Sequence, residues 1–189
     1  MPQYGWVLDY KRCIECRACE AACKQWNGLE TGIRFRQVRV YETGQFPKVQ
    51  SHALSLACNH CDNPLCLKVC PTKSIFRHAA TGAVLINQET CVGCELCSQF
   101  CPYGALQINT KTRKMSKCTM CSDRLEQNLQ PACVTLCPTG ALQFGPWDQI
   151  QNRGTDRAPN FPNPATTRPS IRFIDPGWPK AAGSEEVKS

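Results

Sequence analysis

The sequence predicts an α+β fold that is built from short strands and helices and divides into two nested modules followed by a tail. Three observations support this prediction. Sixteen cysteines fall into four groups of four along the 189 residues. Each group opens with two cysteines that have two other residues between them. Short runs of alternating apolar residues, which are typical of strands, lie between the groups. After residue 150 prolines become frequent and apolar clusters sparse, which predicts an extended C-terminal tail.

The elements follow one another in a repeated order. An apolar run at residues 4–8 predicts a strand that leads into the first cysteine group, and the composition of residues 16–26 predicts a short helix. Residues 34–57 contain two alternating runs around a turn, so we expect a β-hairpin inserted between groups one and two. A second, shorter hairpin over residues 75–86 leads into group three. Cysteine loop, helix, hairpin, cysteine loop, helix and strand form an internal repeat.

The spacing within the groups indicates what they bind. Group three has gaps of two, two and three residues before a proline and consists of Cys91, Cys94, Cys97 and Cys101. Bacterial ferredoxins hold iron–sulfur clusters with this run, and its fourth cysteine binds the neighbouring cluster. Group one repeats these gaps, has Lys24 where the proline would follow, and consists of Cys13, Cys16, Cys19 and Cys23.

The other two groups are variants of the same pattern. Group two has gaps of two, four and three residues and consists of Cys58, Cys61, Cys66 and Cys70. Group four has a middle gap of eleven residues and consists of Cys118, Cys121, Cys133 and Cys137. A proline follows the last cysteine of both groups.

The order of the groups predicts how the modules divide. Groups two and three are contiguous and both end in Cys-Pro, so residues 58–109 are expected to form an inner, bacterial-ferredoxin-like module with two clusters. Groups one and four would then form an outer module from residues 1–57 and 110–150, in which the hairpin of residues 34–57 is an insertion. The tail spans residues 151–189. Pairing group one with two and three with four is the alternative that the sequence leaves open.

In the nested arrangement, three cysteines of each group bind one 4Fe-4S cluster and the fourth binds the cluster of the paired group. Cluster 1 would be bound by Cys13, Cys16, Cys19 and Cys137. Cluster 2 would be bound by Cys58, Cys61, Cys66 and Cys101. Cluster 3 would be bound by Cys91, Cys94, Cys97 and Cys70. Cluster 4 would be bound by Cys118, Cys121, Cys133 and Cys23. The expected cofactors are therefore four 4Fe-4S clusters, with iron held by all sixteen cysteines.

Two other uses of cysteine explain the pattern less well. Cysteines of a secreted disulfide scaffold have no reason to fall into four groups with a two-residue opening gap, and residues 1–9 lack the basic and apolar regions of a leader. Zinc sites also begin with such pairs, but a closed tetrahedral site has no use for a third cysteine three residues on. His60 is a candidate ligand as well, but because cysteines already saturate the cluster we expect it to pack beside it.

The net charge and the remaining motifs restrict the function. A formal charge of +7 would ordinarily indicate a nucleic acid or an anionic membrane as partner. Four oxidised clusters with their thiolates would contribute about −8, which leaves about −1, so no nucleic-acid partner is expected. Four basic residues at 111–117 are expected to form a solvated turn near a cluster. No catalytic triad, glycine-rich phosphate loop or carboxylate pair stands out, so we expect an electron carrier without a catalytic site of its own.

Motifs outside the cysteine spacing resemble one known family. They lie at residues 4–9, 58–64, 68–71, 101–105, 117–126, 144–146 and 167–169. From Tyr4 to about Pro176 the chain is similar to the four-cluster iron–sulfur subunit of molybdoenzymes of the dimethyl sulfoxide reductase type. The iron–sulfur subunit of polysulfide reductase is a near relative of that subunit. The resemblance implies nested ligation, a row of four clusters, a molybdopterin catalytic subunit at one end and a quinone-reactive integral-membrane anchor at the other.

Two differences from wider relatives refine this expectation. The nitrate reductase subunit has tryptophan in place of Cys94, which leaves a three-iron cluster, so the resemblance implies that all four clusters here are 4Fe-4S. Formate dehydrogenase subunits typically continue into a C-terminal membrane helix, which this tail lacks. No run is apolar for long enough to span a bilayer, so we expect a peripheral subunit that reaches the membrane through its complex. A subunit of a formate dehydrogenase or hydrogenase complex is the alternative, and the terminal substrate and the membrane face stay open.

Overall fold

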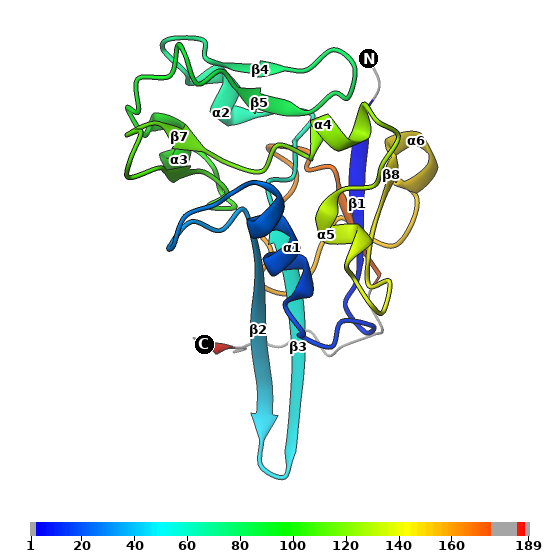
Figure 1. The fold of residues 1–189 in the computed structure, drawn as a ribbon. Helices are drawn as coiled ribbons and strands as arrows, with labels where there is room; N and C mark the ends of the chain where they lie inside the picture. The colour runs from blue at the N-terminus through cyan, green and yellow to red at the C-terminus, as the bar shows by residue number, and fades with distance from the viewer. Residues whose placement is uncertain (1–2, 175–184, 188–189) are drawn as a thin grey trace.

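The computed structural model describes residues 3–174 and 185–187. Short strands and helices form a body from which one long hairpin projects, as Figure 1 shows. The fold is mixed α and β, as the sequence predicts, and most of its helices consist of only four residues.

The first strand is the centre of a three-stranded sheet. Strand β1 (Tyr4–Asp9) pairs antiparallel with β8 (Leu142–Pro146) and parallel with β9 (Ile171–Ile174). The side chains of Leu8 in β1 and Phe173 in β9 are fully buried, so this sheet forms part of the main core. Helix α6 (Trp147–Ile150) follows β8 directly and packs against β1.

The projecting element is the predicted hairpin. Strands β2 (Arg36–Gln45) and β3 (Lys48–Ala57) pair over their whole length, from Arg36 opposite Ala57 to Gln45 opposite Lys48. Its base is buried against the body, whereas Phe46 at the tip is 93% exposed. Strand β10 (Glu185–Val187) pairs antiparallel with β2. The structure therefore confirms the hairpin inserted between the first two cysteine groups.

The segment from residue 58 to residue 116 repeats one small unit. In chain order its elements are α2 (Leu65–Lys68), β4 (Ile75–Arg77), β5 (Val84–Ile86), α3 (Leu96–Gln99), β6 (Gln107–Ile108) and β7 (Met115–Ser116). Strand β4 pairs with β5, and β6 pairs with β7. Ile75, Val84 and Leu106 belong to a separate small core that also contains Cys97.

Three further helices carry or follow cysteines of groups one and four. Helix α1 (Ala18–Trp26) carries the last two cysteines of group one and packs against α5 (Ala132–Thr135), which carries Cys133. Helix α4 (Ser122–Leu125) follows Cys121. The first and last cysteine groups are therefore neighbours in space, although 94 residues lie between Cys23 and Cys118.

The described part of the predicted tail returns to the body. Asn63 donates from Nδ2 to the carbonyl oxygen of Thr166 at 2.7 Å, and Arg168 forms an ion pair with Asp62 at 2.9 Å. The chain then enters the sheet as β9. Of the extended tail that we expected over residues 151–189, residues 175–184 and 188–189 lie outside the described residues. Across the described residues, no helix combines the length and the apolar character that crossing a membrane requires.

Candidate metal centres

All sixteen cysteines are free thiols, and the structure brings them together in sets that draw on two groups each. We define thiol set 1 as the four that line one cavity: Cys13, Cys16, Cys19 and Cys137. Burial raises the pKa of Cys13, and the nearby Cys19 and Cys137 raise it further. A cysteine of group four therefore completes the set that group one begins.

Thiol set 2 lines a second cavity and consists of Cys58, Cys61, Cys66 and Cys101. Burial, together with the neighbouring Cys58, raises the pKa of Cys61 and of Cys66 to about 12, and Cys101 contributes to both shifts. Arg77 fixes the loop that carries Cys61, because its Nη2 donates to the Cys61 carbonyl oxygen at 2.9 Å.

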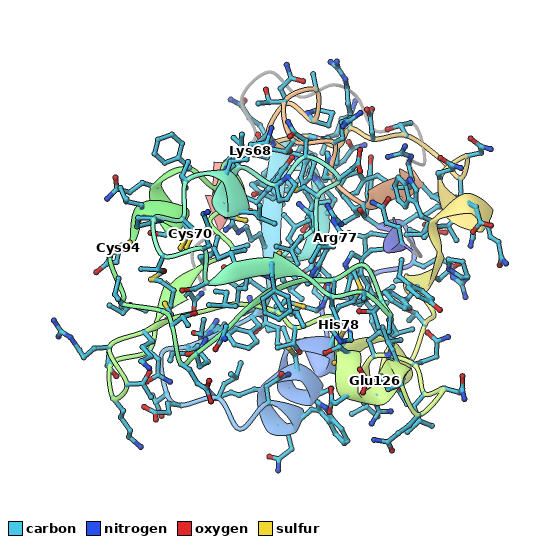
Figure 2. The ribbon with its side chains drawn as sticks, turned by 90° about the horizontal axis from the view of Figure 1, so that it is seen from above. Lys68, Cys70, Arg77, His78, Cys94 and Glu126 are labelled. Atoms are coloured by element: carbon cyan, nitrogen blue, oxygen red, sulfur yellow. The ribbon has the colours of Figure 1, made fainter. Side chains whose placement is uncertain are left out.

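Thiol set 3 consists of Cys91, Cys94, Cys97 and Cys70. Burial raises the pKa of Cys97 to about 11, and Cys94, Cys70 and Cys91 add to the shift in that order. Cys94 is exposed, and Figure 2 shows it with Cys70 at one edge of the molecule. This set is therefore close to the surface.

Thiol set 4 consists of Cys118, Cys121, Cys133 and Cys23. Burial raises the pKa of Cys23 to about 12; Arg36 lowers it in part, and Cys133 and Cys121 raise it. Burial also raises the pKa of Cys118, with Cys23 as its first thiol neighbour.

Electrostatic effects between thiols of different sets indicate the order of the sets in space. Cys133 of set 4 raises the pKa of Cys19 in set 1, so these two sets are neighbours. Cys58 of set 2 raises the pKa of Cys118 in set 4, so sets 2 and 4 are also neighbours. Cys97 of set 3 acts on the pKa of Cys66 in set 2. The sets therefore follow one another as 1, 4, 2 and 3, which differs from the order of the groups along the chain.

The fourth cysteines of groups two and four, Cys70 and Cys137, each begin a Cys-Pro-Thr turn that supplies hydrogen-bond donors. Burial of Cys70 opposes ionisation, but hydrogen bonds from Thr72 and from backbone N–H groups outweigh it and lower the pKa. The same balance lowers the pKa of Cys137, to which the Leu142 N–H donates at 3.4 Å. Each turn therefore stabilises the thiolate of the cysteine that joins the thiol set of another group.

Two buried cations accompany the thiols, and the sequence reasoning missed both. Arg36 is 2% exposed and lies 4.7 Å from the ring centre of Trp6. Burial lowers its pKa, but Cys133 and other thiolates of sets 1 and 4 outweigh burial and hold the pKa above its ordinary value. Lys117 is 3% exposed and donates to the carbonyl oxygens of Val84 and Cys118. The expected solvated turn is therefore wrong at Lys117, which points into the protein.

The sequence offered a signal for each cation. Arg36 shares a strand face with the buried Val38, so the alternation of β2 already directs its side chain inward. Lys117 directly precedes the buried Cys118, in a chain whose thiolates need positive charge nearby.

His60 lies where it was expected, beside set 2 and within the lining of the same cavity. It is 1% exposed. Burial lowers its pKa well below the ordinary value, and the positive charges of Lys117 and Arg77 lower it further. The imidazole is therefore neutral.

The sets fit clusters better than single ions. Among the described residues, no group of three or more His, Cys, Asp or Glu side chains is placed to hold one metal ion. A cubane cluster needs a wider arrangement, since each of its four thiolates binds a different iron. The high thiol pKa values mean that most of these cysteines ionise only when metal binds, so loading would release protons.

Comparison with known proteins agrees with this interpretation of the cysteines. The model of a 4Fe-4S dicluster domain matches residues 49–147, and that of a 4Fe-4S binding domain matches residues 10–26. One of the chains of the anaerobic dimethyl sulfoxide reductase of Escherichia coli is 37% identical over 179 residues, which is 89% of this chain and 87% of the relative.

Two further relatives extend the comparison. The corresponding chain of the Haemophilus influenzae enzyme is 37% identical over 182 residues, 90% of this chain and 88% of the relative. One of the subunits of the sulfite dehydrogenase of Allochromatium vinosum is 36% identical over 166 residues, 77% of this chain and 69% of the relative. The sulfur geometry, the dicluster match and these relatives lead to one conclusion: the chain is a member of the family of iron–sulfur electron-transfer subunits of dimethyl sulfoxide reductase type molybdoenzymes.

Proposed function

We propose that this chain carries single electrons through four 4Fe-4S clusters between a molybdopterin catalytic subunit and a quinone-reactive integral-membrane anchor. The observation that supports this most directly is the composition of the thiol sets, each of which joins three cysteines of one group to the fourth cysteine of another. A 4Fe-4S cluster takes four thiolates, so sixteen cysteines supply four clusters with none left over. The chain would lie at the periphery of a membrane, as part of that complex.

The division of ligands that we propose is the nested one. Clusters 1 to 4 would occupy thiol sets 1 to 4, as defined above. Cys137 lies on the cavity of group one and Cys101 on that of group two, whereas pairing group one with group two would require Cys70 and Cys23 in those places. The inner module would comprise residues 58–109 and the outer module residues 1–57 and 110–150.

A row of clusters converts two-electron chemistry at its ends into single-electron steps, because each cluster cycles by one electron. Following the spatial order of the sets, the row would run from cluster 1 through clusters 4 and 2 to cluster 3. Ile14, between two cysteines of set 1, is 63% exposed, and Val92, between two cysteines of set 3, is 64% exposed. The ends of the row are therefore the places at which partner subunits can come close to a cluster.

The ligand division can be tested at Cys94. After anaerobic purification we expect a brown protein with about sixteen irons per chain, since each of four clusters holds four. Replacing Cys94 with serine should change the electron paramagnetic resonance (EPR) signal of cluster 3 alone, because only set 3 contains this thiol. Val92→Ala, in the same loop but without a ligand atom, is the control and should keep all four signals. Loss of two clusters in the Cys94 variant would contradict the division, and a colourless protein that holds zinc would contradict the function.

The partners can be tested by anaerobic capture of the tagged chain from its host and mass spectrometry of what is retained. We expect a molybdopterin subunit and an integral-membrane subunit. Recovery of a formate dehydrogenase or hydrogenase catalytic subunit would instead support the alternative complex.

A further inference from the structure

The imidazole of His60 presents a hydrogen-bond donor to the cavity of thiol set 2. Its Nδ1 lies 3.0 Å from the backbone nitrogen of Val84, which carries a hydrogen and can only donate. Nδ1 therefore accepts, and the proton of the neutral ring sits on Nε2. The tautomer follows from a backbone group and does not depend on any exposed side chain.

The Nε2–H group has nothing to donate to within the described part of the chain, although it is buried. Buried N–H groups in folded proteins are almost always paired. The acceptor should therefore be something that fills the cavity lined by His60 and the four thiols of set 2. Asn59 also lines this cavity, and its side chain has no partner among the described residues. Its amide can turn either the oxygen or the nitrogen toward the cavity, whereas the bond from Val84 fixes which nitrogen of His60 faces it.

The position of His60 is held from two sides. Val84 belongs to β5, and on the other side Ser170, which directly precedes β9, donates from Oγ to the carbonyl oxygen of His60 at 3.1 Å. The backbone N–H of Ser170 donates to the carbonyl oxygen of Asn59, also at 3.1 Å. His60 itself has a φ of 43°, in the left-handed region that side chains other than glycine adopt only when their surroundings impose it. Two distant parts of the chain therefore fix where Nε2–H points.

We propose that Nε2–H of His60 donates a hydrogen bond to a sulfur of cluster 2 and raises the reduction potential of that cluster. The inference rests on the proposed function, which places a cluster in set 2. Reduction adds one electron and makes the cluster sulfurs more negative, so a donor aimed at them stabilises the reduced state more than the oxidised state. His60 is in this sense a positioning and tuning residue and not a ligand. Cluster 2 would then accept an electron more readily than it would beside an apolar residue.

Two variants of the cluster-loaded protein distinguish the effect of the Nε2–H donor from that of the hydrogen bond between Nδ1 and Val84. Asparagine at position 60 can place its Oδ1 where Nδ1 stands and so keep the acceptor for the Val84 N–H, but it has no donor at the Nε2 position. Glutamine reaches as far as Nε2 with an N–H donor. The readout is a redox titration of each cluster by EPR.

We expect His60→Asn to make cluster 2 about tenfold harder to reduce at a fixed potential, which for a one-electron couple corresponds to about 59 mV. The other three clusters should keep their potentials, and His60→Gln should recover a large part of the change. An unaltered cluster 2 potential in a His60→Asn protein that holds all four clusters would overturn the proposal.

A measurement on the unmodified protein keeps the test decisive if His60→Asn fails to fold. With ¹⁵N-labelled histidine and exchange into D₂O, electron–nuclear double resonance of reduced cluster 2 should show an exchangeable deuteron and a weakly coupled histidine nitrogen. Absence of both couplings in a protein with four intact clusters would refute the hydrogen bond alone. Absence of the clusters themselves would refute the proposed function.

Discussion

Two positive charges are buried with the thiolates, and each is held by backbone oxygens. Nη1 of Arg36 donates to the carbonyl oxygen of Ser55 at 3.0 Å, and Nζ of Lys117 donates to that of Cys118 at 3.1 Å. A charge in the interior is costly unless opposite charge and hydrogen bonds accompany it, and loaded clusters supply the negative charge here. The cysteine spacing predicts the clusters, and the alternation of β2 turns Arg36 inward, but which thiols the two cations meet there depends on how the strand and the loops pack.

Replacing Gly93 with alanine should disturb cluster 3, because the added methyl group would displace the loop that carries Cys91 and Cys94. Gly93 has a φ of 69°, and a Cβ atom built on it would overlap the carbonyl oxygen of Arg113. Gly93→Ala should therefore lower stability by about 1–3 kcal/mol and displace the loop between Cys91 and Cys94. We expect a lower apparent Tm and a weakened EPR signal of cluster 3, with the signals of the other clusters retained.

Gly28 is a matched control for this substitution. It has a similar φ of 56°, but a Cβ atom there would meet nothing within 4 Å. Gly28→Ala should cost only the backbone strain, about 1 kcal/mol, and leave every cluster signal unchanged. Equal effects of the two variants would show that the contact with Arg113 is unimportant.

At the scale of single elements, β9 is a strand that the sequence reasoning did not predict. Ile171 and Phe173 alternate inward and are nearly or fully buried, yet they follow a proline-rich stretch that predicts no core of its own. The strand forms because β1 offers a free edge opposite β8, and that edge comes from the other end of the chain. A short run with two apolar residues facing inward is a weak signal on its own, so only the tertiary partner determines it.

Removal of β9 should therefore damage the body of the protein. A chain that ends at Asn160 loses the β1–β9 pairing, the buried Phe173 and the Ser170 bonds to Asn59 and His60. Losing Phe173 alone should cost about 3–5 kcal/mol. We expect a large drop in the apparent Tm and loss of cluster 2, measured by thermal melting and EPR.

A chain that ends at Ile174 provides the comparison. It keeps β9 and all of these contacts, and of the described elements it lacks only β10. This variant should retain all four cluster signals. Retention of a normal melting curve by the shorter chain would contradict the structural role of β9.

For the whole molecule, the sequence allows a good prediction of the parts that depend on cysteine spacing. The gaps within each group predict the cluster loops, and the alternation of apolar residues over 34–57 predicts the inserted hairpin. The pairing of groups one and four follows only by elimination and from the resemblance, because nothing near Cys13 encodes a partner at Cys137. The spatial order of the sets had no local signal at all, since it results from how the repeats pack against each other.

Metal should be necessary for the fold as a whole. Cys19, Cys23, Cys58, Cys118 and Cys133 belong to the main buried core, so residues that we propose as iron ligands also fill the interior. Without clusters the cavities of thiol sets 1 and 2 would be left open, and nothing would join the cysteines of different groups there. We expect removal of iron by a chelator under reducing conditions to abolish most of the far-ultraviolet circular dichroism, and reconstitution with iron and sulfide to restore it. A native spectrum after complete iron removal would contradict this expectation.

The central place of β1 also determines the order of events during biosynthesis. The ribosome makes this strand before its two neighbours, β8 and β9, which emerge more than 130 residues later. The four thiols of set 2 are all available once Cys101 has been made, whereas set 1 waits for Cys137. We therefore expect the inner segment to accept metal on a nascent chain while β1 is still unpaired, so that β1, although it is made before both of its neighbours, reaches its final place later than the inner segment.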